Sequence, residues 1–224
     1  MLPQLNSPQQ SETQLLKVID DARVDVIAID APLTLPPCLT CPSYCRGPGE
    51  LCELTAAREM WATGMNPVSQ RPCEQVVVDQ VGERPLPTMQ LGVITGRAVA
   101  LARCLSSRGR APSIMERGEV LEVYPRASLK RLGASDGRLA PKTKGETYES
   151  YRDRVLEGFG DLIDGLDAHD AEFDVPHVLD ALTAAYTGWL APAGLEAPPE
   201  DFNIASGWIW FPRAGSPTGL AADI

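Results

Sequence analysis

Three carboxylates that are far apart in the chain lie within or beside apolar segments. Asp30 directly follows the apolar run 26–29, Glu122 lies inside the segment 120–124, and Asp180 is the only charged residue between positions 178 and 192. Carboxylates from separate elements can together hold Mg²⁺ or Mn²⁺, because these ions prefer oxygen ligands. Such ions stabilise the attacking and the leaving oxygen of a phosphodiester. The three acids therefore predict metal-dependent phosphodiester hydrolysis.

Each acid also has an ordinary structural explanation. Asp30 can cap the turn that follows it. Glu122 can form an ion pair with a nearby arginine, such as Arg126, because a buried carboxylate is costly without a cation. Asp180 can be a solvated side chain on a short alanine-rich helix; His177 lies one turn earlier, on roughly the same side. The functional hypothesis requires the three acids to lie together in the fold.

Hydrophobic periodicity predicts the elements that must position these acids. Near-continuous apolar runs at 24–30 and 120–124 predict two buried strands of a parallel sheet, and ligands bind beyond the carboxyl ends of such strands. Residues 64–87 are predicted to be irregular, with an extended stretch at 76–78, and the aromatic segment 207–212 to pack back as an edge strand. Apolar residues at helical spacing predict helices at 11–22 (opened by a capping box at Ser11–Gln14), 55–63, 88–107, 146–164 and 175–187 (capped by Asp174, closed by Gly188).

Charge and hydropathy limit the classes of partner. The formal net charge is -10, so non-specific nucleic-acid binding by counterion release is weak. A nucleic-acid partner then requires bound metal or a local basic patch, for which the arginines and lysines between 97 and 144 are candidates; a solvated face is the alternative. No apolar run of about 18 residues is present, and the first ten residues lack the features of a secretory signal. We therefore expect a cytoplasmic protein with no membrane partner.

Four cysteines are clustered in a loop rich in proline and glycine. The positions are Cys38, Cys41, Cys45 and Cys52, with the spacing C-x₂-C-x₃-C-x₆-C. Four thiolates can close a tetrahedral zinc site, and the metal would order a loop with few apolar side chains. An iron–sulfur cluster and free or paired thiols are the alternatives. With four protein ligands, the zinc would be structural.

Five short segments, in this order, resemble the domain of unknown function 429 family, whose members are predicted ribonuclease H-like nucleases. The resemblance covers roughly residues 13–212. It rests on Val24-Asp25-Val26-Ile27-Ala28-Ile29-Asp30-Ala31-Pro32, Arg71-Pro72-Cys73-Glu74, Glu122-Val123-Tyr124-Pro125, Asp180-Ala181-Leu182 and Gly207-Trp208-Ile209.

The resemblance implies an α/β fold of the ribonuclease H-like type, a mixed sheet with flanking helices. It implies that Asp30, Glu122 and Asp180 form the acidic site, with Arg71 and Glu74 near it. Arg71, Glu74 and His177 are the candidates for substrate binding. A ribonuclease H-like domain begins with strands that carry a first catalytic Asp, and this chain begins at the following helix. We therefore expect an exposed sheet edge at 24–30 that favours self-association. The expected organisation is a disordered segment 1–10, the domain 11–212 with a Cys-rich loop 36–54, and a tail 213–224.

Three functions follow from these observations. The first is a Mg²⁺- or Mn²⁺-dependent nuclease. The second is a non-catalytic, zinc-containing interaction protein derived from the same fold. The third is a thiol redox protein that uses Cys38 and Cys41, and it is disfavoured because this pair is expected in a loop that does not open a helix, where a thiolate would be stabilised.

Overall fold

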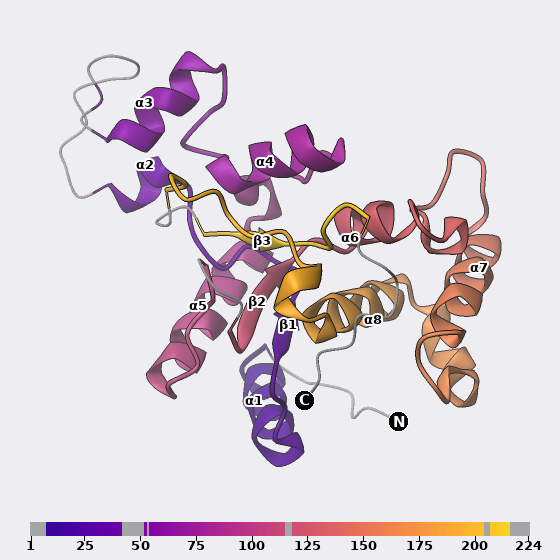
Figure 1. The fold of residues 1–224 in the computed structure, drawn as a ribbon. Helices are drawn as coiled ribbons and strands as arrows, with labels where there is room; N and C mark the ends of the chain where they lie inside the picture. The colour runs from indigo at the N-terminus through magenta and orange to yellow at the C-terminus, as the bar shows by residue number, and fades with distance from the viewer. Residues whose placement is uncertain (1–7, 42–51, 53, 115–117, 204–206, 216–224) are drawn as a thin grey trace.

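A computed structural model describes residues 8–41, 52, 54–114, 118–203 and 207–215, with side chains from Thr13 onward. The chain is an α/β protein in which short strands are surrounded by helices (Figure 1). The elements, with η for a 3₁₀ helix, are α1 (Pro8–Ala22), β1 (Ile27–Ile29), α2 (Pro37–Thr40), α3 (Thr55–Ala62), α4 (Pro72–Val81), η2 (Thr88–Leu91), α5 (Val93–Ser107), β2 (Val120–Val123), α6 (Pro125–Leu132), η3 (Gly137–Leu139), α7 (Tyr148–Gly160), η4 (Leu166–Asp174), α8 (Pro176–Trp189), η5 (Pro192–Gly194) and β3 (Ile209–Trp210). No helix of this described part is long and apolar enough to span a membrane.

The described sheet has the order β1-β2-β3, and both pairings are parallel. In register, Ile29 lies beside Glu122 and Glu122 beside Ile209. The predicted mixed sheet is therefore wrong for these strands, which all run the same way. Their carboxyl ends consequently meet at one edge of the sheet, where ligands of open α/β sheets bind.

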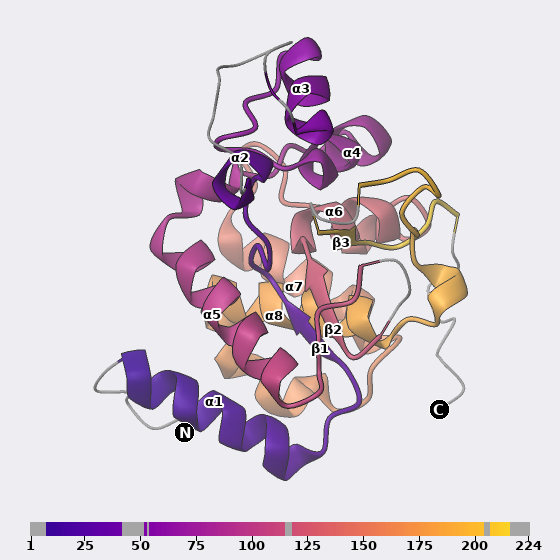
Figure 2. The ribbon, with the colours of Figure 1, turned by 90° about the vertical axis from the view of Figure 1, so that its left-hand side faces the viewer.

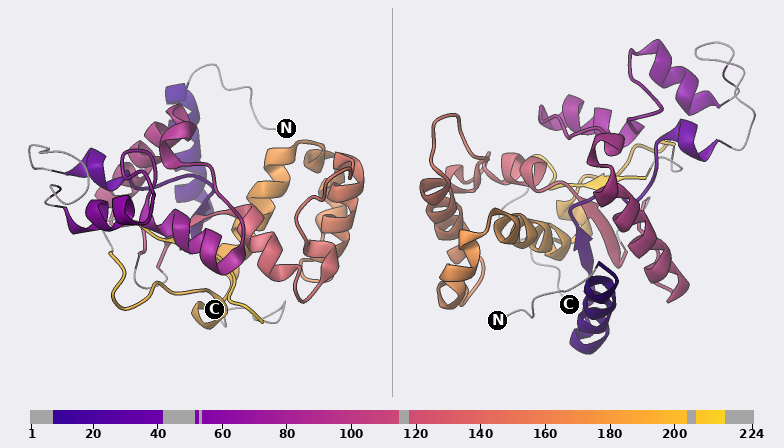
Figure 3. Two further views of the ribbon diagram at one scale, coloured as in Figure 1. Left: turned by 90° about the horizontal axis from the view of Figure 1, so that it is seen from above. Right: turned by 180° about the vertical axis from the view of Figure 1, so that it is seen from behind.

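Helices cover both faces of the sheet (Figure 1, and from behind in Figure 3, right). Ile27 and Ile29 pack in a cluster with buried residues of α1 and α5, and Figure 2 shows these two helices side by side in front of β1. Ala28 points to the other face, where α8 packs on β1. Gly188 of α8 permits this contact, since a Cβ there would lie 3.1 Å from the Ala28 Cβ. Because successive side chains of a strand alternate between faces, the two faces present different residues of β1.

Helices α4, α6 and α8 each begin with a proline, and α4 and α6 were not predicted. Pro72 opens α4, where an irregular region with an extended stretch was expected, and Pro125 opens α6, where only the end of a strand was expected. Pro176 opens α8. Proline at this position is preorganised for a helix, because its fixed φ suits the first turn and its missing N–H has no partner there anyway. The β-branched residues of α4 were read as extended, but Gly82, with φ +71°, ends the helix in the left-handed conformation typical of a helix C-terminus.

Other boundaries differ from the prediction in informative ways. Helix α1 already begins at Pro8, so the predicted capping box lies inside the helix. The predicted helix 88–107 is divided at Gly92 into η2 and α5. Asp174 does not cap α8, whose N-cap Val175 has no side-chain cap, and instead pairs with Arg152. Helix α8 also continues through Gly188, which serves close packing and does not end the helix.

The aromatic tail forms the predicted edge strand. Among the described strands, β3 pairs only with β2. The indole N–H groups of Trp208 and Trp210 donate to the Glu196 and Ser113 carbonyls at 3.0 and 2.9 Å. Gly207, with φ +74°, lets the tail pass Thr34, whose Oγ1 would lie 2.3 Å from an added Cβ. At the opposite edge, β1 pairs only with β2 among the described residues.

Candidate functional site

A cavity of about 320 Å³ lies beyond the carboxyl ends of β1 and β2. Asp30 enters it directly after β1, Tyr124 directly after β2, and Asp180 from α8. The side chains that line it come from these strand ends, from α6, α7 and α8, and from the segment before α7. They are Asp30, Tyr124, Pro125, Arg126, Leu129, Pro141, Lys142, Tyr148, Tyr151, Pro176 and Asp180. Two of the three predicted acids therefore share one cavity.

Asp30 and Asp180 form no ion pair with a lysine or arginine of the described residues. Burial among the pocket atoms, and then repulsion from Asp180 and Glu122, raise the pKa of Asp30 to about 7, although the residue as a whole remains solvent-exposed. Burial likewise raises the pKa of Asp180, which is half-buried, and the nearby His177 opposes both shifts. Neither carboxylate has a hydrogen bond or ion pair to the described residues beyond this electrostatic contact. Partly buried acids with raised pKa values are typical of functional sites, so the pair is a candidate site for a cation or for proton transfer.

The third acid, Glu122, is paired with a buried arginine. Its Oε1 accepts from Arg71 Nη2 at 2.5 Å, and its Oε2 accepts from Arg71 Nη1 and from the Leu33 backbone N–H, both at 2.9 Å. Both residues are almost fully buried, with 1% of Arg71 and 5% of Glu122 exposed. Glu122 lies beside Ile29 in register, so it points to the sheet face opposite Asp180. The structure therefore places Glu122 in an ion pair and does not bring its oxygens into the cavity; its partner is Arg71, while Arg126 pairs with Glu83.

Arg71 connects this ion pair to two further segments. Its Nε donates to Thr88 Oγ1 at 2.7 Å and to Glu74 Oε1 at 3.2 Å, and its Nη1 donates to Thr34 Oγ1 at 2.9 Å. Glu74 also accepts from the Thr88 hydroxyl and backbone N–H. Arg71 and Glu74 therefore do not line the cavity, and they hold the segment after Asp30 against β2 and α4.

Sequence reasoning named Arg126 and Lys142 only as members of the basic region 97–144, and it did not single out the tyrosines of the cavity. Tyr124 lies within the quoted Glu-Val-Tyr-Pro segment, which was the available signal for it. Tyr148 and Tyr151 are three residues apart at the start of α7, and Lys142 precedes that helix. Their spacing is that of ordinary amphipathic packing, so only the tertiary structure shows that they face Asp30 and Asp180. His177 is exposed and does not line this cavity.

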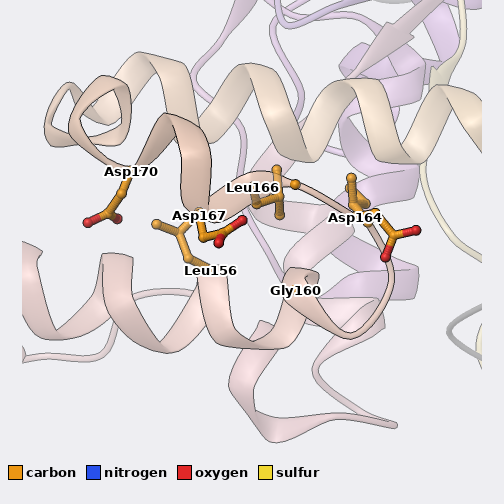
Figure 4. A pocket seen from close by; sticks show the side chains of 8 residues that line it. Leu156, Gly160, Asp164, Leu166, Asp167 and Asp170 are labelled. Carbon is orange, nitrogen blue, oxygen red and sulfur yellow. The ribbon is translucent and has the colours of Figure 1, made fainter.

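A larger cavity, of about 460 Å³, lies between α7 and η4 and is lined by Asp164, Asp167 and Asp170 with apolar residues between them. Figure 4 shows these carboxylates spread along the cavity and directed away from one another. In the parts of the chain that the structure describes, no group of three or more His, Cys, Asp or Glu side chains is placed to hold a metal ion. This cavity therefore lacks the convergent groups of a reactive site.

The cysteine cluster is described only in part, since Cys45 lies outside the described residues. Cys38 lies in the first turn of α2 and Cys41 directly follows that helix, so the expectation that this pair does not open a helix is wrong. The helix has four residues, which gives it little dipole to stabilise a thiolate. Cys52 Sγ donates to the Leu54 carbonyl at 3.7 Å.

Several side chains of the basic region 97–144 are engaged in ion pairs. Arg108 pairs with Asp20, Arg110 with Glu119, and Arg138 with Asp136 and Asp161. These contacts are those of a solvated surface, and Arg126 and Lys142 are the basic residues of this region that line the cavity.

Comparison with known proteins agrees with the family that the sequence segments resemble. The family model described as "Protein of unknown function (DUF429)" matches residues 7–202. No curated protein and no solved structure matches the chain. Because the family model covers most of the chain, this protein belongs to the DUF429 family.

Proposed function

We propose that this protein is a phosphodiesterase that acts on nucleic acid with the help of a divalent metal ion. One observation carries the proposal: Asp30 and Asp180, from separate elements, line the same cavity beyond the strand ends, and neither pairs with a lysine or arginine of the described residues. The proposal includes a ribonuclease H-like relationship. The family resemblance implies this relationship, and the positions of the two acids support it.

The chemistry of the two acids fits Mg²⁺ or Mn²⁺. Both carboxylates are partly desolvated and they repel each other, so a cation between them would favour their charged forms. Mg²⁺ is commonly bound through one or two carboxylates together with substrate phosphates and water, which suits a site with two acids. When bound there, such an ion would polarise a phosphoryl oxygen and lower the pKa of a water molecule.

The other residues have supporting roles in this proposal. Lys142 and Arg126 line the same cavity and supply positive charge for a phosphate. Glu122 is a positioning residue, because its Oε2 holds the Leu33 backbone N–H at 2.9 Å and so holds the segment that follows Asp30. Arg71 holds Glu122 and Thr34 in the same way.

The test is Mg²⁺- or Mn²⁺-dependent hydrolysis of bis(p-nitrophenyl) phosphate and of labelled DNA and RNA. Asp30→Asn and Asp180→Asn should each lower the rate about 100-fold or more, because each removes a negatively charged ligand while keeping the shape. Asp164→Asn, an exposed acid of the other cavity, is the matched control and should retain the full rate. Equal rates for the wild type and both cavity variants would reject the proposal.

The alternative function is a non-catalytic interaction protein with zinc in its cysteine loop. The observation that favours it is the engagement of Glu122 with Arg71, which leaves two acids where three were expected. Elemental analysis of the purified protein separates the two functions when read beside the hydrolysis assay. Stoichiometric zinc without metal-dependent hydrolysis would favour the alternative.

A further inference from the structure

The cavity beyond β1 and β2 has three chemically different walls. Asp30 and Asp180 form an acidic wall at the sheet and α8, and the tyrosines at the start of α7 form an aromatic wall. Arg126 of α6 and Lys142 form a basic wall. This combination matches a ligand that has both a planar ring and a phosphate.

The aromatic wall is held rigidly. The Tyr148 hydroxyl donates to the Phe173 carbonyl at 2.7 Å, which fixes the half-buried ring. Its ring centroid lies 6.2 Å from that of Tyr151, with the planes inclined by 57°. Tyr151 is 8% exposed, and the Arg154 guanidinium lies over its ring at 5.6 Å. Tyr148 is therefore a preorganised surface for a base, with Tyr151 as its support.

The basic wall contains one cation that is available to a ligand. Arg126 Nε already binds the Glu83 carboxylate at 2.6 Å. Lys142 is exposed and lines the cavity, and it forms no ion pair with the described residues. A phosphate that enters the cavity would therefore meet Lys142 as an unneutralised partner.

We propose that the cavity takes the terminal nucleotide of a single nucleic-acid strand, with its base on Tyr148 and its phosphate at Lys142. This inference rests on the proposed function and names its substrate. A volume of about 320 Å³ is at the lower end of the range for a small-molecule site, so it suits one nucleotide and not a duplex. A duplex would also require many phosphate contacts, which a chain of net charge -10 with one available cation at its site cannot offer.

The first experiment measures binding of adenosine 5′-monophosphate by calorimetry in Mg²⁺, with ribose 5-phosphate as the probe that lacks a base. We expect adenosine 5′-monophosphate to bind at least tenfold more tightly, because stacking of a base on an aromatic ring contributes that much. Equal affinities would overturn the inference.

Variants assign this binding to the two walls. Lys142→Ala should weaken binding of adenosine 5′-monophosphate about tenfold, whereas Lys144→Ala, an equally exposed lysine outside the cavity, should leave it unchanged. Tyr148→Ala should weaken it about tenfold. Tyr148→Phe should weaken it less than Tyr148→Ala does, because it keeps the ring that stacks on the base and loses only the hydroxyl that fixes the ring. Equal loss in Lys142→Ala and Lys144→Ala, or no loss in Tyr148→Ala when its circular dichroism is native, would overturn the inference.

The second experiment tests the requirement for a strand end. Linear single strands of DNA and RNA should release mononucleotides at least tenfold faster than blunt duplexes of the same sequence, and circular single strands should remain intact. Comparable cleavage of circular and linear strands would overturn the terminal-nucleotide inference and leave the phosphodiesterase proposal standing. Binding of adenosine 5′-monophosphate that depends on Lys142 and Tyr148, without hydrolysis of any phosphodiester, would instead support the nucleotide site and overturn the phosphodiesterase proposal.

Discussion

Two groups of acids lie near the carboxyl ends of β1 and β2, on opposite sides of the sheet. On one side, Glu122 is buried against Arg71, and its oxygens accept hydrogen bonds from that guanidinium and from the Leu33 N–H. On the other side, Asp30 and Asp180 share an open cavity and pair with no lysine or arginine of the described residues, and the pKa of both is raised by burial.

The difference shows how one strand can serve both structure and function. A buried carboxylate with a matched guanidinium holds segments together, and its removal leaves an uncompensated charge. A pair of carboxylates without such a partner lowers the stability of the folded protein. Such pairs are typical of functional sites, where a bound ligand interacts with the charges. Proximity to the strand end is therefore insufficient to identify a functional acid, and charge compensation separates the two groups.

The largest expected effect is the loss of stability when the arginine that pairs with the buried Glu122 is removed. Arg71→Met should lower the free energy of unfolding by about 3–5 kcal/mol, because it leaves Glu122 buried and unpaired. Urea denaturation measures the loss. Arg108→Met, which breaks an exposed ion pair with Asp20, is the control and should change stability by less than about 1 kcal/mol. The double variant with Glu122→Gln should recover part of the loss; no recovery would show that charge imbalance is not its cause.

An intermediate effect is expected where α8 packs on β1. Gly188→Leu should lower the free energy of unfolding by about 2 kcal/mol and reduce hydrolysis, because the new side chain would collide with Ala28 and Val26 and displace Asp180 from Asp30. The matched control is Gly96→Ala on the exposed side of α5, where an added Cβ meets nothing within 4 Å. It should gain about 0.5–1 kcal/mol from helix propensity. Unchanged stability of the leucine variant would contradict the close packing.

The smallest expected effect is a gain in stability, and it comes from removing the charge of Asp30 in the cavity. The folded protein holds the Asp30 proton more tightly than the unfolded chain does, because the pKa rises from 3.8 to about 7. The stability of the wild type should therefore fall as the pH rises between these values. Asp30→Asn removes this cost and should be more stable than the wild type by about 1 kcal/mol at pH 8, discounted for the exposure of the residue, with the gain vanishing near pH 4. Denaturation curves at both pH values measure it, and an asparagine variant that is less stable at pH 8 would show that Asp30 is compensated after all.

Much of the fold could be predicted from periodicity. The apolar runs located β1 and β2, although the strands are shorter than the runs, and the aromatic segment 207–212 contains the predicted edge strand. Helices α3, α5, α7 and α8 lie within or close to their predicted ranges. These elements were predictable because each must bury one face, and burial leaves a period in the sequence.

Helices α4 and α6 were not predicted because proline and valine were each given a single structural meaning. Proline can end one element and open the next, and valine occurs in helices as well as in strands. Pro125 was taken as the end of a strand and the region around Pro72 as irregular, yet proline in a first turn opens a helix. The valines of α4 have weak helix propensity, and tertiary packing overrides it, since Val77 and Val81 are buried in the main core. Propensity alone therefore could not decide this segment.

By itself, the sequence determined that Asp30, Glu122 and Asp180 were the acids to consider, because each stands out against apolar neighbours. Only the tertiary structure decided that Asp30 and Asp180 share a cavity, whereas Glu122 forms an ion pair with Arg71, 51 residues away along the chain. The physical reason is that a local pattern reports how much of a side chain is buried. Which charge it meets there depends on contacts between distant segments, and these exist only after folding.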